Sequence, residues 1–476
     1  MNKVSFVLDD EIKVIDFSQT PFSPTTTVLK YLRSLTSHKG VKEGCGEGDC
    51  GACTVVIAEP DNNKLHYRTV DSCLIFLPMI HGKQLITVEN LSDGYGGLHP
   101  VQQAMVDAYA SQCGYCTPGF VMSLFALYKS PEKVNRENIL DAISGNLCRC
   151  TGYQPIIEAA EKVCRKRKDD IFSTKEKQSL RLLKQINKTE TISFITNNQK
   201  YFKPFSLNEA LLLKSKYPEA IIVSGNTDNG LRVNKKHELL QEIIDISDVQ
   251  ELKNITETKE NLSVGAGVTM EQLKQATASC FPALHKMLTV FGSKQIRNMA
   301  TIGGNIGSAS PIGDSLPLLM AYDAVMAVCN QNESRVIKLC DFIKSYRKTD
   351  LRKDEIICSV GIPFPKKNQI IRSYKISKRK DLDISTCSAG FMLDIDQKNR
   401  KIKNMVLAFG GMAATTKRAV ETEEFLIGKI WRKAIVEKAS TILYNEFSPL
   451  SDARSGEEFR RLAARNLLFK FYKETS

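Results

Sequence analysis

Fourteen cysteines occur in this 476-residue chain, and eight of them fall within its first 150 residues. They form two quartets, one in the segments GCGEGDCGACTVV and DSCL and the other in QCGYCTPG and LCRCTGY. The first quartet has a C-x4-C-x2-C spacing followed by a distant fourth cysteine, which is a known ligand spacing for a 2Fe–2S cluster. The quartets are Cys45, Cys50, Cys53 and Cys73, and Cys113, Cys116, Cys148 and Cys150.

Closely spaced cysteines also occur in disulfide scaffolds and in zinc sites. A disulfide scaffold is usually a short secreted chain, whereas this one is long, and we expect no secretion signal behind its Met-Asn-Lys start. Zinc sites often use histidine, but none of the six histidines lies within four residues of a quartet cysteine. Gly44, Gly46, Gly48 and Gly51 would let the first loop wrap a cluster closely and aim amides at its sulfurs. We therefore predict one 2Fe–2S cluster at each quartet.

The remaining cysteines occur singly, and we predict that they are free thiols, which fits a cytoplasmic protein. Two one-electron centres on one chain imply electron transfer between a donor and an acceptor. The single cysteines are Cys164, Cys280, Cys329, Cys340, Cys358 and Cys387.

The formal net charge is +13, and ten of the basic residues lie between Lys162 and Lys188. Such a run could bind nucleic acid, but it has few aromatic residues and separates two predicted folded regions. We therefore interpret it as a solvated, mobile linker and predict no nucleic-acid partner. No apolar run approaches 18 residues, so we also predict no membrane contact.

The first region, residues 1–90, shows alternating strand patterns on both sides of Asp9-Asp10, which predict a β-hairpin. A helix with Val28 and Leu32 on one face should follow, and strands are expected at 54–58 and 84–88. Residues 91–168 show helical patterns, with Pro100 in a first turn and Asn135 as an N-cap. Four helices with thiols at their junctions would hold the second cluster.

Two glycine-containing turns suggest a further cofactor site in the middle of the chain. One is IVSGNTDNGLRV and the other is ATIGGNIGSASPIGD, and neither matches the G-x-G-x-x-G dinucleotide motif. Their amides could still bind a pyrophosphate, and Asp314 could accept hydrogen bonds from ribose or ribityl hydroxyls. A flavin is favoured because it accepts single electrons and delivers a hydride, which connects iron–sulfur centres to a nicotinamide.

Together these motifs resemble the iron–sulfur and flavin part of xanthine dehydrogenases, in the molybdenum hydroxylase family. The resemblance runs essentially end to end, through SPLSDARSGEEFRRLAARNLL. It implies an α+β multidomain fold: a β-grasp 2Fe–2S ferredoxin domain, a four-helix-bundle 2Fe–2S domain, a PCMH-type α+β FAD-binding domain and a C-terminal α+β domain like that of CO dehydrogenase flavoproteins. The implied limits are 1–90 and 91–168 for the cluster domains, 169–190 for the basic linker, 191–366 for the FAD-binding domain and 367–476 for the last.

The resemblance also implies the cofactor contacts. The eight quartet cysteines would ligate the clusters. The FAD contacts would be Ile222, Val223, Ser224, Gly225, Asn226, Thr227, Asp228, Asn229, Phe291, Thr301, Ile302, Gly303, Gly304, Asn305, Asp314, Ile357 and Lys375. No catalytic residue is assigned on this chain.

The implied function is that of an iron–sulfur/FAD subunit of xanthine dehydrogenase. A large molybdopterin-binding partner would convert xanthine, NAD and water to urate and NADH, and this chain would pass the electrons through two clusters and FAD to NAD. Such pairs are expected to assemble as dimers of heterodimers. The alternatives are the equivalent subunit of a molybdenum hydroxylase acting on an aldehyde or N-heterocycle, and a non-enzymatic redox sensor.

Overall fold

The computed structural model describes residues 2–92, 97–196 and 198–476. Within these residues the chain forms two compact units. Unit 1 comprises Met1–Leu213, Glu219–Val249 and Ser293–Ala300, and unit 2 comprises Lys214–Pro218, Gln250–Gly292 and Thr301–Ser476. No helix in the described residues is both long and apolar enough to cross a membrane.

Unit 1 begins with a five-stranded β-grasp sheet of strand order β2-β1-β5-β3-β4. The predicted hairpin is confirmed, and its turn residues Asp9 and Asp10 have φ of 56° and 59°, which suit a tight turn between twisted strands. Thr27 caps helix α1 by accepting a hydrogen bond from the Lys30 amide. The elements are β1 (Lys3–Leu8), β2 (Glu11–Asp16), α1 (Val28–Ser34), β3 (Thr54–Asp61), β4 (Lys64–Asp71), β5 (Gln84–Ile86) and the short 3-10 turns η1 (Leu77–Ile80) and η2 (Val88–Leu91).

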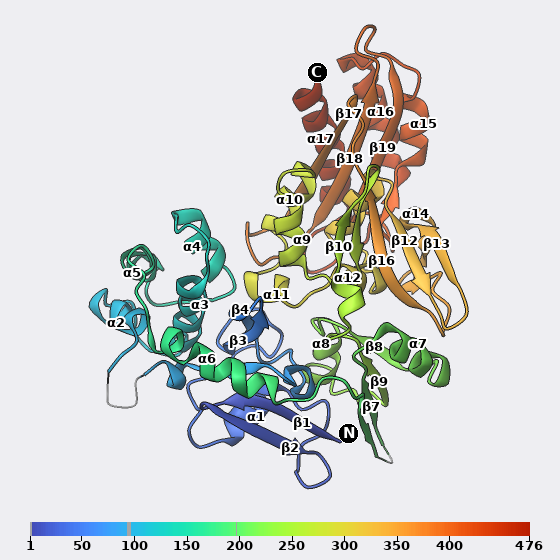
Figure 1. Ribbon diagram of the computed structural model, residues 1–476. Coiled ribbons are helices and arrows are strands. Elements are labelled where there is room, and N and C mark those ends of the chain that lie inside the picture. The colour runs from blue at the N-terminus through green and yellow to red at the C-terminus, as the bar shows by residue number, and fades with distance from the viewer. Residues whose placement is uncertain (1, 93–96, 197) are drawn as a thin grey trace. The chain divides into compact units, whose positions relative to one another are not determined.

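The predicted four-helix bundle follows and is confirmed (Figure 1). Pro100 is the first residue of its first helix, and the Asn135 side chain caps the third by accepting a hydrogen bond from the Asn138 amide at 2.8 Å. Two apolar helices begin directly after the cysteine motifs, so the thiols lie at the helix junctions. The helices are α2 (Pro100–Asp107), α3 (Thr117–Lys129), α4 (Arg136–Ile143) and α5 (Gln154–Cys164).

The interpretation of residues 169–190 as a mobile linker is wrong. Ile171–Lys184 form helix α6, and Phe172 is buried in the core of the bundle with its ring centroid 4.8 Å from that of Phe125. Asp170 caps the helix by accepting a hydrogen bond from the Ser173 amide. Four of the ten basic residues, Lys175, Lys177, Arg181 and Lys184, lie on the exposed face of this helix, which a charge count alone does not reveal.

A second sheet, of order β6-β7-β9-β8, completes unit 1 and shares one hydrophobic core with the β-grasp sheet. Tyr201 and Val223 from this sheet join Phe6 and Val55 in that core. The segment predicted as an FAD-binding domain, 191–366, therefore contributes to both units. The elements here are β6 (Ile192–Ile195), β7 (Lys200–Lys203), α7 (Leu207–Lys216), β8 (Ile221–Val223), α8 (Asn229–Asn234), β9 (Glu242–Asp245) and α11 (Lys294–Arg297).

A buried row of ion pairs joins the two sheets of unit 1. Lys203 Nζ lies 2.8 Å from Asp245 and 2.9 Å from Asp248, and its side chain is 0% exposed. Lys83 Nζ continues the row, at 3.1 Å from Asp248 and 3.2 Å from Glu59. Because each buried charge has an opposite partner, the row fixes one sheet against the other.

Unit 2 contains a five-stranded sheet of order β10-β11-β16-β12-β13 and the helices α9, α10, α12, α13 and α14. The elements are η3 (Gln250–Lys253), β10 (Ile255–Glu257), β11 (Asn261–Gly265), α9 (Met270–Ala276), α10 (Pro282–Thr289), α12 (Ile302–Gly307), α13 (Ser315–Ala321), β12 (Val325–Cys329), β13 (Ser334–Lys338), α14 (Leu339–Phe342), β14 (Ile343–Ser345), β15 (Lys348–Thr349) and β16 (Ile356–Pro363).

The C-terminal part of unit 2 is an antiparallel sheet of order β17-β18-β19-β20 that packs against three helices (Figure 1). Gly390 lets the sheet approach α13 closely, because a Cβ atom there would lie 2.4 Å from Leu318 Cα. The elements are β17 (Gln369–Ile376), β18 (Cys387–Ile395), β19 (Ile402–Gly410), β20 (Lys417–Arg418), α15 (Val420–Leu426), α16 (Lys433–Glu446) and α17 (Glu457–Thr475).

The row of buried ion pairs yields a stability prediction. Lys203→Met leaves Asp245 and Asp248 buried without their main cation, so we expect the free energy of unfolding of unit 1 to fall by about 3–5 kcal/mol. Lys200→Met is the matched control, because Lys200 lies on the same strand and pairs with Glu242 at the surface, where the expected cost is about 0–1 kcal/mol. Urea unfolding curves of the two variants measure the difference, and equal midpoints would contradict it.

Helix α6 yields a prediction about pH. Burial alone would raise the pKa of Asp170, but hydrogen bonds from His99 and Lys129 outweigh it and hold the pKa well below its usual value. A carboxylate with a lowered folded-state pKa stabilises the fold above its unfolded pKa of about 3.9, and this contribution is lost as the pH falls below that value. Asp170→Asn should therefore destabilise the protein by about 2 kcal/mol at pH 7 and by much less near pH 2.

Amide hydrogen exchange in α6 reports this difference. Asp169→Asn is the control, because Asp169 is exposed and directly precedes the capping residue. A loss of protection that is the same at both pH values, or the same in both variants, would contradict the proposed stabilisation of α6 by the Asp170 carboxylate.

Candidate functional site

The first quartet lies in the loop between α1 and β3 and just after β4. The Cys45 thiol neighbours that of Cys50, and the Cys53 thiol neighbours that of Cys73, so the quartet contains two pairs of adjacent thiols. Cys53 and Cys73 are buried, whereas Cys45 and Cys50 are half-buried. The structure brings the four predicted thiols together.

The backbone of this loop directs amides at sulfur, as predicted. The amides of Glu47 and Asp49 donate to Cys45 Sγ at 3.4 and 3.3 Å. Gly48 has φ of 75°, which favours glycine, and a Cβ atom on Gly44 would lie 2.8 Å from Cys50 Sγ. Amide donors around thiolate sulfur are the usual surroundings of an iron–sulfur cluster.

The paired thiols respond to each other electrostatically. The hydrogen bond from Cys50 and the amides of Glu47 and Asp49 lower the pKa of Cys45 to about 5, while the hydrogen bond to Cys45 raises the pKa of Cys50. Two adjacent thiols thus share one proton, and both can be thiolates only when a cation neutralises them. Iron would supply that charge.

The second quartet also forms two pairs, at the junctions of the helical bundle. Cys113 and Cys150 are exposed with their sulfurs 3.7 Å apart, and Cys116 hydrogen bonds to Cys148. Cys148 Sγ also accepts from the amide of Thr151 at 3.4 Å. Unlike the first quartet, this one has half of its ligands at the protein surface.

The pairing of the thiols decides which kind of metal centre fits. No group of three or more His, Cys, Asp or Glu side chains in the described residues is arranged to hold a single metal ion. A 2Fe–2S cluster takes two thiolates on each of its two irons, so two pairs of adjacent cysteines suit it.

The two cysteine loops are joined directly. The Leu147 amide, next to Cys148, donates to the Cys50 carbonyl at 3.0 Å. The buried Asn146 side chain donates to the Gly51 carbonyl at 3.1 Å. A Cβ atom on Gly51 would lie 2.3 Å from the Gly145 carbonyl, so the two backbones are in contact.

A short segment distant in sequence completes this junction and was missed by the sequence reasoning. Gln295, which is fully buried, donates to Asn146 Oδ1 at 3.0 Å and to Ser123 Oγ at 3.2 Å. Arg297 pairs with Asp141 at 2.6 Å. The one available signal was the polar run SKQIRN directly before the second glycine-containing turn, and nothing in it indicated which elements it contacts.

Unit 1 carries the first set of predicted FAD contacts, Ile222–Asn229, at the end of β8 and the start of α8. Gly225 is required by packing, because a Cβ atom there would lie 1.9 Å from the Met299 carbonyl. Among the described residues, the amides of Asn226, Thr227 and Asp228 donate to no acceptor. Asn226 Oδ1 is buried and likewise has no partner among the described residues. Three free amides in succession fit an anion such as a pyrophosphate.

Unit 2 carries the second set of predicted FAD contacts. Thr301 begins helix α12 and accepts a hydrogen bond from the Gly304 amide at 3.2 Å. The amides of Ile302 and Gly303 donate to the carbonyls of Val268 and Ala266, so this turn keeps fewer free amides than the turn in unit 1. Its predicted role as an amide nest is not supported, and contacts of residues 301–305 with FAD stay a prediction.

The predicted Asp314 and Lys375 contact each other. Lys375 Nζ lies 2.7 Å from Asp314 and donates to the Val290 carbonyl, next to the predicted Phe291. Ser385 also donates to Asp314. Ile357, on β16, lies against α12, where a Cβ atom on Gly307 would be 3.5 Å from its Cδ1. These predicted residues therefore share one region of unit 2.

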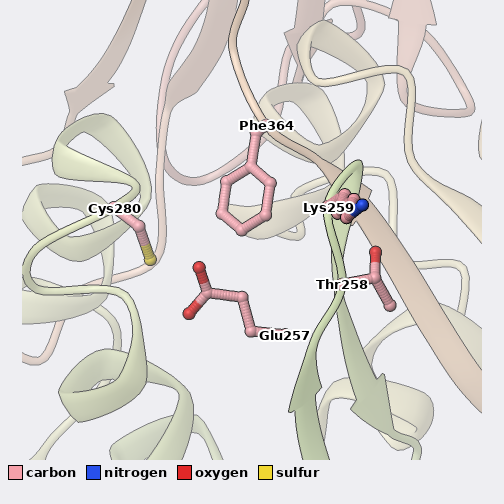
Figure 2. A pocket seen from close by; sticks show the side chains of 5 residues that line it. All are labelled: Glu257, Thr258, Lys259, Cys280 and Phe364. Atoms are coloured by element: carbon pink, nitrogen blue, oxygen red, sulfur yellow. The ribbon is translucent and has the colours of Figure 1, made fainter.

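Unit 2 also has an open pocket of about 890 Å³, lined by Glu257, Thr258, Lys259, Cys280 and Phe364 (Figure 2). None of these residues was predicted to be functional. Burial raises the pKa of the Cys280 thiol, so it is protonated at neutral pH and is a poor nucleophile. The side chains that line this pocket do not form a recognisable catalytic or binding site.

Four family models match successive parts of the chain. Residues 17–77 match a 2Fe-2S iron-sulfur cluster binding domain and residues 87–161 a [2Fe-2S] binding domain. Residues 195–365 match the FAD binding domain in molybdopterin dehydrogenase, and residues 372–475 match the CO dehydrogenase flavoprotein C-terminal domain.

Full-length relatives are similar over most of the chain. Xanthine dehydrogenase of Oryza sativa subsp. japonica is 33% identical over 94% of this chain and 38% of its own length. Aldehyde oxidase of Homo sapiens is 30% identical over 95% of this chain and 38% of its own length. The chain thus spans well under half of the length of these relatives.

A solved structure supports the fold. A reconstituted CO dehydrogenase from Oligotropha carboxidovorans superimposes with a TM-score of 0.54 at 22% identity, covering 58% of this chain and 97% of that chain. Taken with the four matched domains and the two thiol quartets, these similarities show that the chain is an iron–sulfur and FAD-binding region of the molybdenum hydroxylase family.

Proposed function

We propose that this chain is the iron–sulfur/FAD electron-transfer part of a xanthine dehydrogenase. A molybdopterin-binding partner would oxidise xanthine with water to urate, and the two electrons released would leave through this chain to NAD. The balanced reaction is xanthine + H2O + NAD+ → urate + NADH + H+. The observation that carries the proposal is the direct contact between the two cysteine loops, through the hydrogen bond from Leu147 to Cys50. The identity to xanthine dehydrogenases supports the choice of substrate.

The proposed cofactors are two 2Fe–2S clusters and one FAD. The eight quartet cysteines would ligate the clusters, which carry one electron each, and the amides around Cys45 would stabilise thiolate charge. In unit 1, the free amides of residues 226–228 would bind part of FAD. In unit 2, residues 301–305, Asp314 and Lys375 would do so. FAD converts single electrons into the hydride that NAD accepts.

The surface around the second quartet suits contact with the partner. Cys113 and Cys150 are exposed, and exposed apolar side chains lie near them in sequence, with Tyr109 87% and Val106 58% exposed. Exposed apolar side chains near a redox centre favour a protein–protein interface there. We propose that the molybdopterin-binding partner docks at this surface and that two such heterodimers associate.

A cytoplasmic location is part of the proposal. It is supported by the single cysteines, none of which forms a disulfide in the described structure, as expected in a reducing compartment.

A second candidate is the equivalent part of another molybdenum hydroxylase, acting on an aldehyde or an N-heterocycle. The 30% identity to a human aldehyde oxidase favours it almost as strongly. Both candidates give this chain the same role, because the substrate would be bound by the partner. The redox-sensor alternative has no comparable support.

The proposal is tested first with the purified intact chain. Anaerobic addition of NADH should bleach the flavin absorbance and produce two distinguishable EPR signals from reduced clusters, because hydride transfer to FAD is reversible. Dithionite provides the fully reduced reference. Iron that dithionite reduces and NADH does not would contradict NAD as the acceptor. In the complex purified from its native cell, turnover of xanthine about tenfold faster than of aldehydes would separate the first candidate from the second.

The ligand assignment is tested by single cysteine variants. Cys150→Ser should remove half of the iron and one of the two EPR signals, while flavin content stays unchanged, because only the second quartet loses a ligand. Cys340→Ser is the matched control, since Cys340 is also exposed but belongs to no quartet. Full iron content in Cys150→Ser, or equal losses in both variants, would show that the second quartet does not bind a cluster.

A further inference from the structure

Three side chains from outside the β-grasp domain contact the loop of the first quartet. Asn226 Nδ2 donates to the Leu74 carbonyl at 2.7 Å, and Asn234 Nδ2 donates to the carbonyls of Cys73 and Gly46. Lys235 Nζ donates to the Cys45 carbonyl at 3.1 Å. The carbonyls of Cys45 and Cys73 are therefore both bound by side chains at the C-terminal end of helix α8, and Asn226 of the predicted FAD segment binds the carbonyl of Leu74, next to Cys73.

The helix that presents these donors is held close to the loop. A Cβ atom on Gly230, in α8, would lie 3.2 Å from the Leu74 carbonyl, so the helix backbone packs directly on the chain beside Cys73. Asn234 is the last residue of α8 and Lys235 is its C-cap, so their positions are fixed by the helix rather than by a loose surface loop.

A positive charge beside the first quartet would raise the reduction potential of a 2Fe–2S cluster bound there. A 2Fe–2S cluster with four thiolates is anionic, and its reduction adds one more negative charge. Hydrogen-bond donors and a cation beside the ligands stabilise the reduced form more than the oxidised form. A carboxylate at the same place has the opposite effect, and Glu47 lies 3.5 Å from Lys235 in the same loop.

We propose that Asn234 and Lys235 are positioning residues that raise the reduction potential of the first cluster. The proposal rests on the assignment, in the proposed function, of the first quartet to a 2Fe–2S cluster. Asn226 belongs to the predicted FAD segment and holds the same loop, so the potential of the cluster is set by residues continuous with the flavin-binding turn. The opposed charges of Lys235 and Glu47 adjust it in opposite directions.

The test is an EPR-monitored potentiometric measurement on the intact chain with its cofactors. Lys235→Gln should lower the ratio of reduced to oxidised first cluster, at a fixed solution potential, on the order of fivefold, which is about 40 mV for a one-electron centre. Glu47→Gln should raise the same ratio, because it removes a negative charge beside the cluster. The backbone amide of residue 47 still donates to Cys45 Sγ, so only the charge changes. The second cluster serves as an internal reference and should not move.

Lys236→Gln is the matched control. It removes the same charge one residue further along, but the Lys236 side chain is 69% exposed and pairs with Glu238 at 4.0 Å. Asn234→Ala should lower the potential without any change of charge. Equal shifts in Lys235→Gln and Lys236→Gln, or shifts of the same sign in Lys235→Gln and Glu47→Gln, would overturn the proposal.

The EPR spectra distinguish a failure of the proposed function from a failure of the proposed tuning by Asn234 and Lys235. If the unaltered chain lacks an EPR signal from the first cluster, the proposed function itself is contradicted. If both signals are present and the first is insensitive to these substitutions, the cluster assignment stands and the proposed tuning by Asn234 and Lys235 is wrong.

Discussion

The hydrogen bond from the Leu147 amide to the Cys50 carbonyl is the contact on which the rest of unit 1 depends. It joins a residue beside one thiol quartet to a cysteine of the other, so the two loops that we propose to hold the clusters are in direct contact. Beside it the buried Gln295 Nε2 donates to Asn146 Oδ1, whereas Gln295 Oε1 has no partner among the described residues. Any larger residue in place of Gly51 would push the backbones of the two cysteine loops apart, because no space exists there for a side chain.

Much of this fold follows from local patterns in the sequence. The Asp9-Asp10 hairpin, the Asn135 cap and the helix start at Pro100 were all predictable, since each depends on a few neighbouring residues. The grouping of the cysteines into two quartets was predictable for the same reason. Their spacing and the interleaved glycines reflect the local geometry of one loop wrapped around a cluster. The FAD-binding domain and the family were also predicted, from the glycine-containing turns and the resemblance of the motifs, and the similarity to known proteins confirms both.

The remaining features depend on contacts between distant parts of the chain. Helix α6 looked like a linker because its charges dominate the composition, while the burial of Phe172 depends on Phe125 in another helix. The ion pairs of Lys203 and Lys83 with Asp248 are invisible to periodicity, because each lysine could equally well be a surface residue. The distribution of residues 191–366 over both units follows from the packing of Val223 and Ile243 with the β-grasp core, which no local pattern encodes.

If the two touching loops each hold a cluster, the two clusters must lie close enough for their unpaired spins to interact. Low-temperature EPR spectroscopy of the fully reduced chain compares the two cluster signals with the spectrum of a protein that retains the first cluster alone. We expect the unpaired spins of the two clusters to split or broaden each other's signals, because the Leu147 amide hydrogen bonds to the Cys50 carbonyl and holds the two loops together. A spectrum that is the plain sum of two independent signals would contradict the claim that the loops touch.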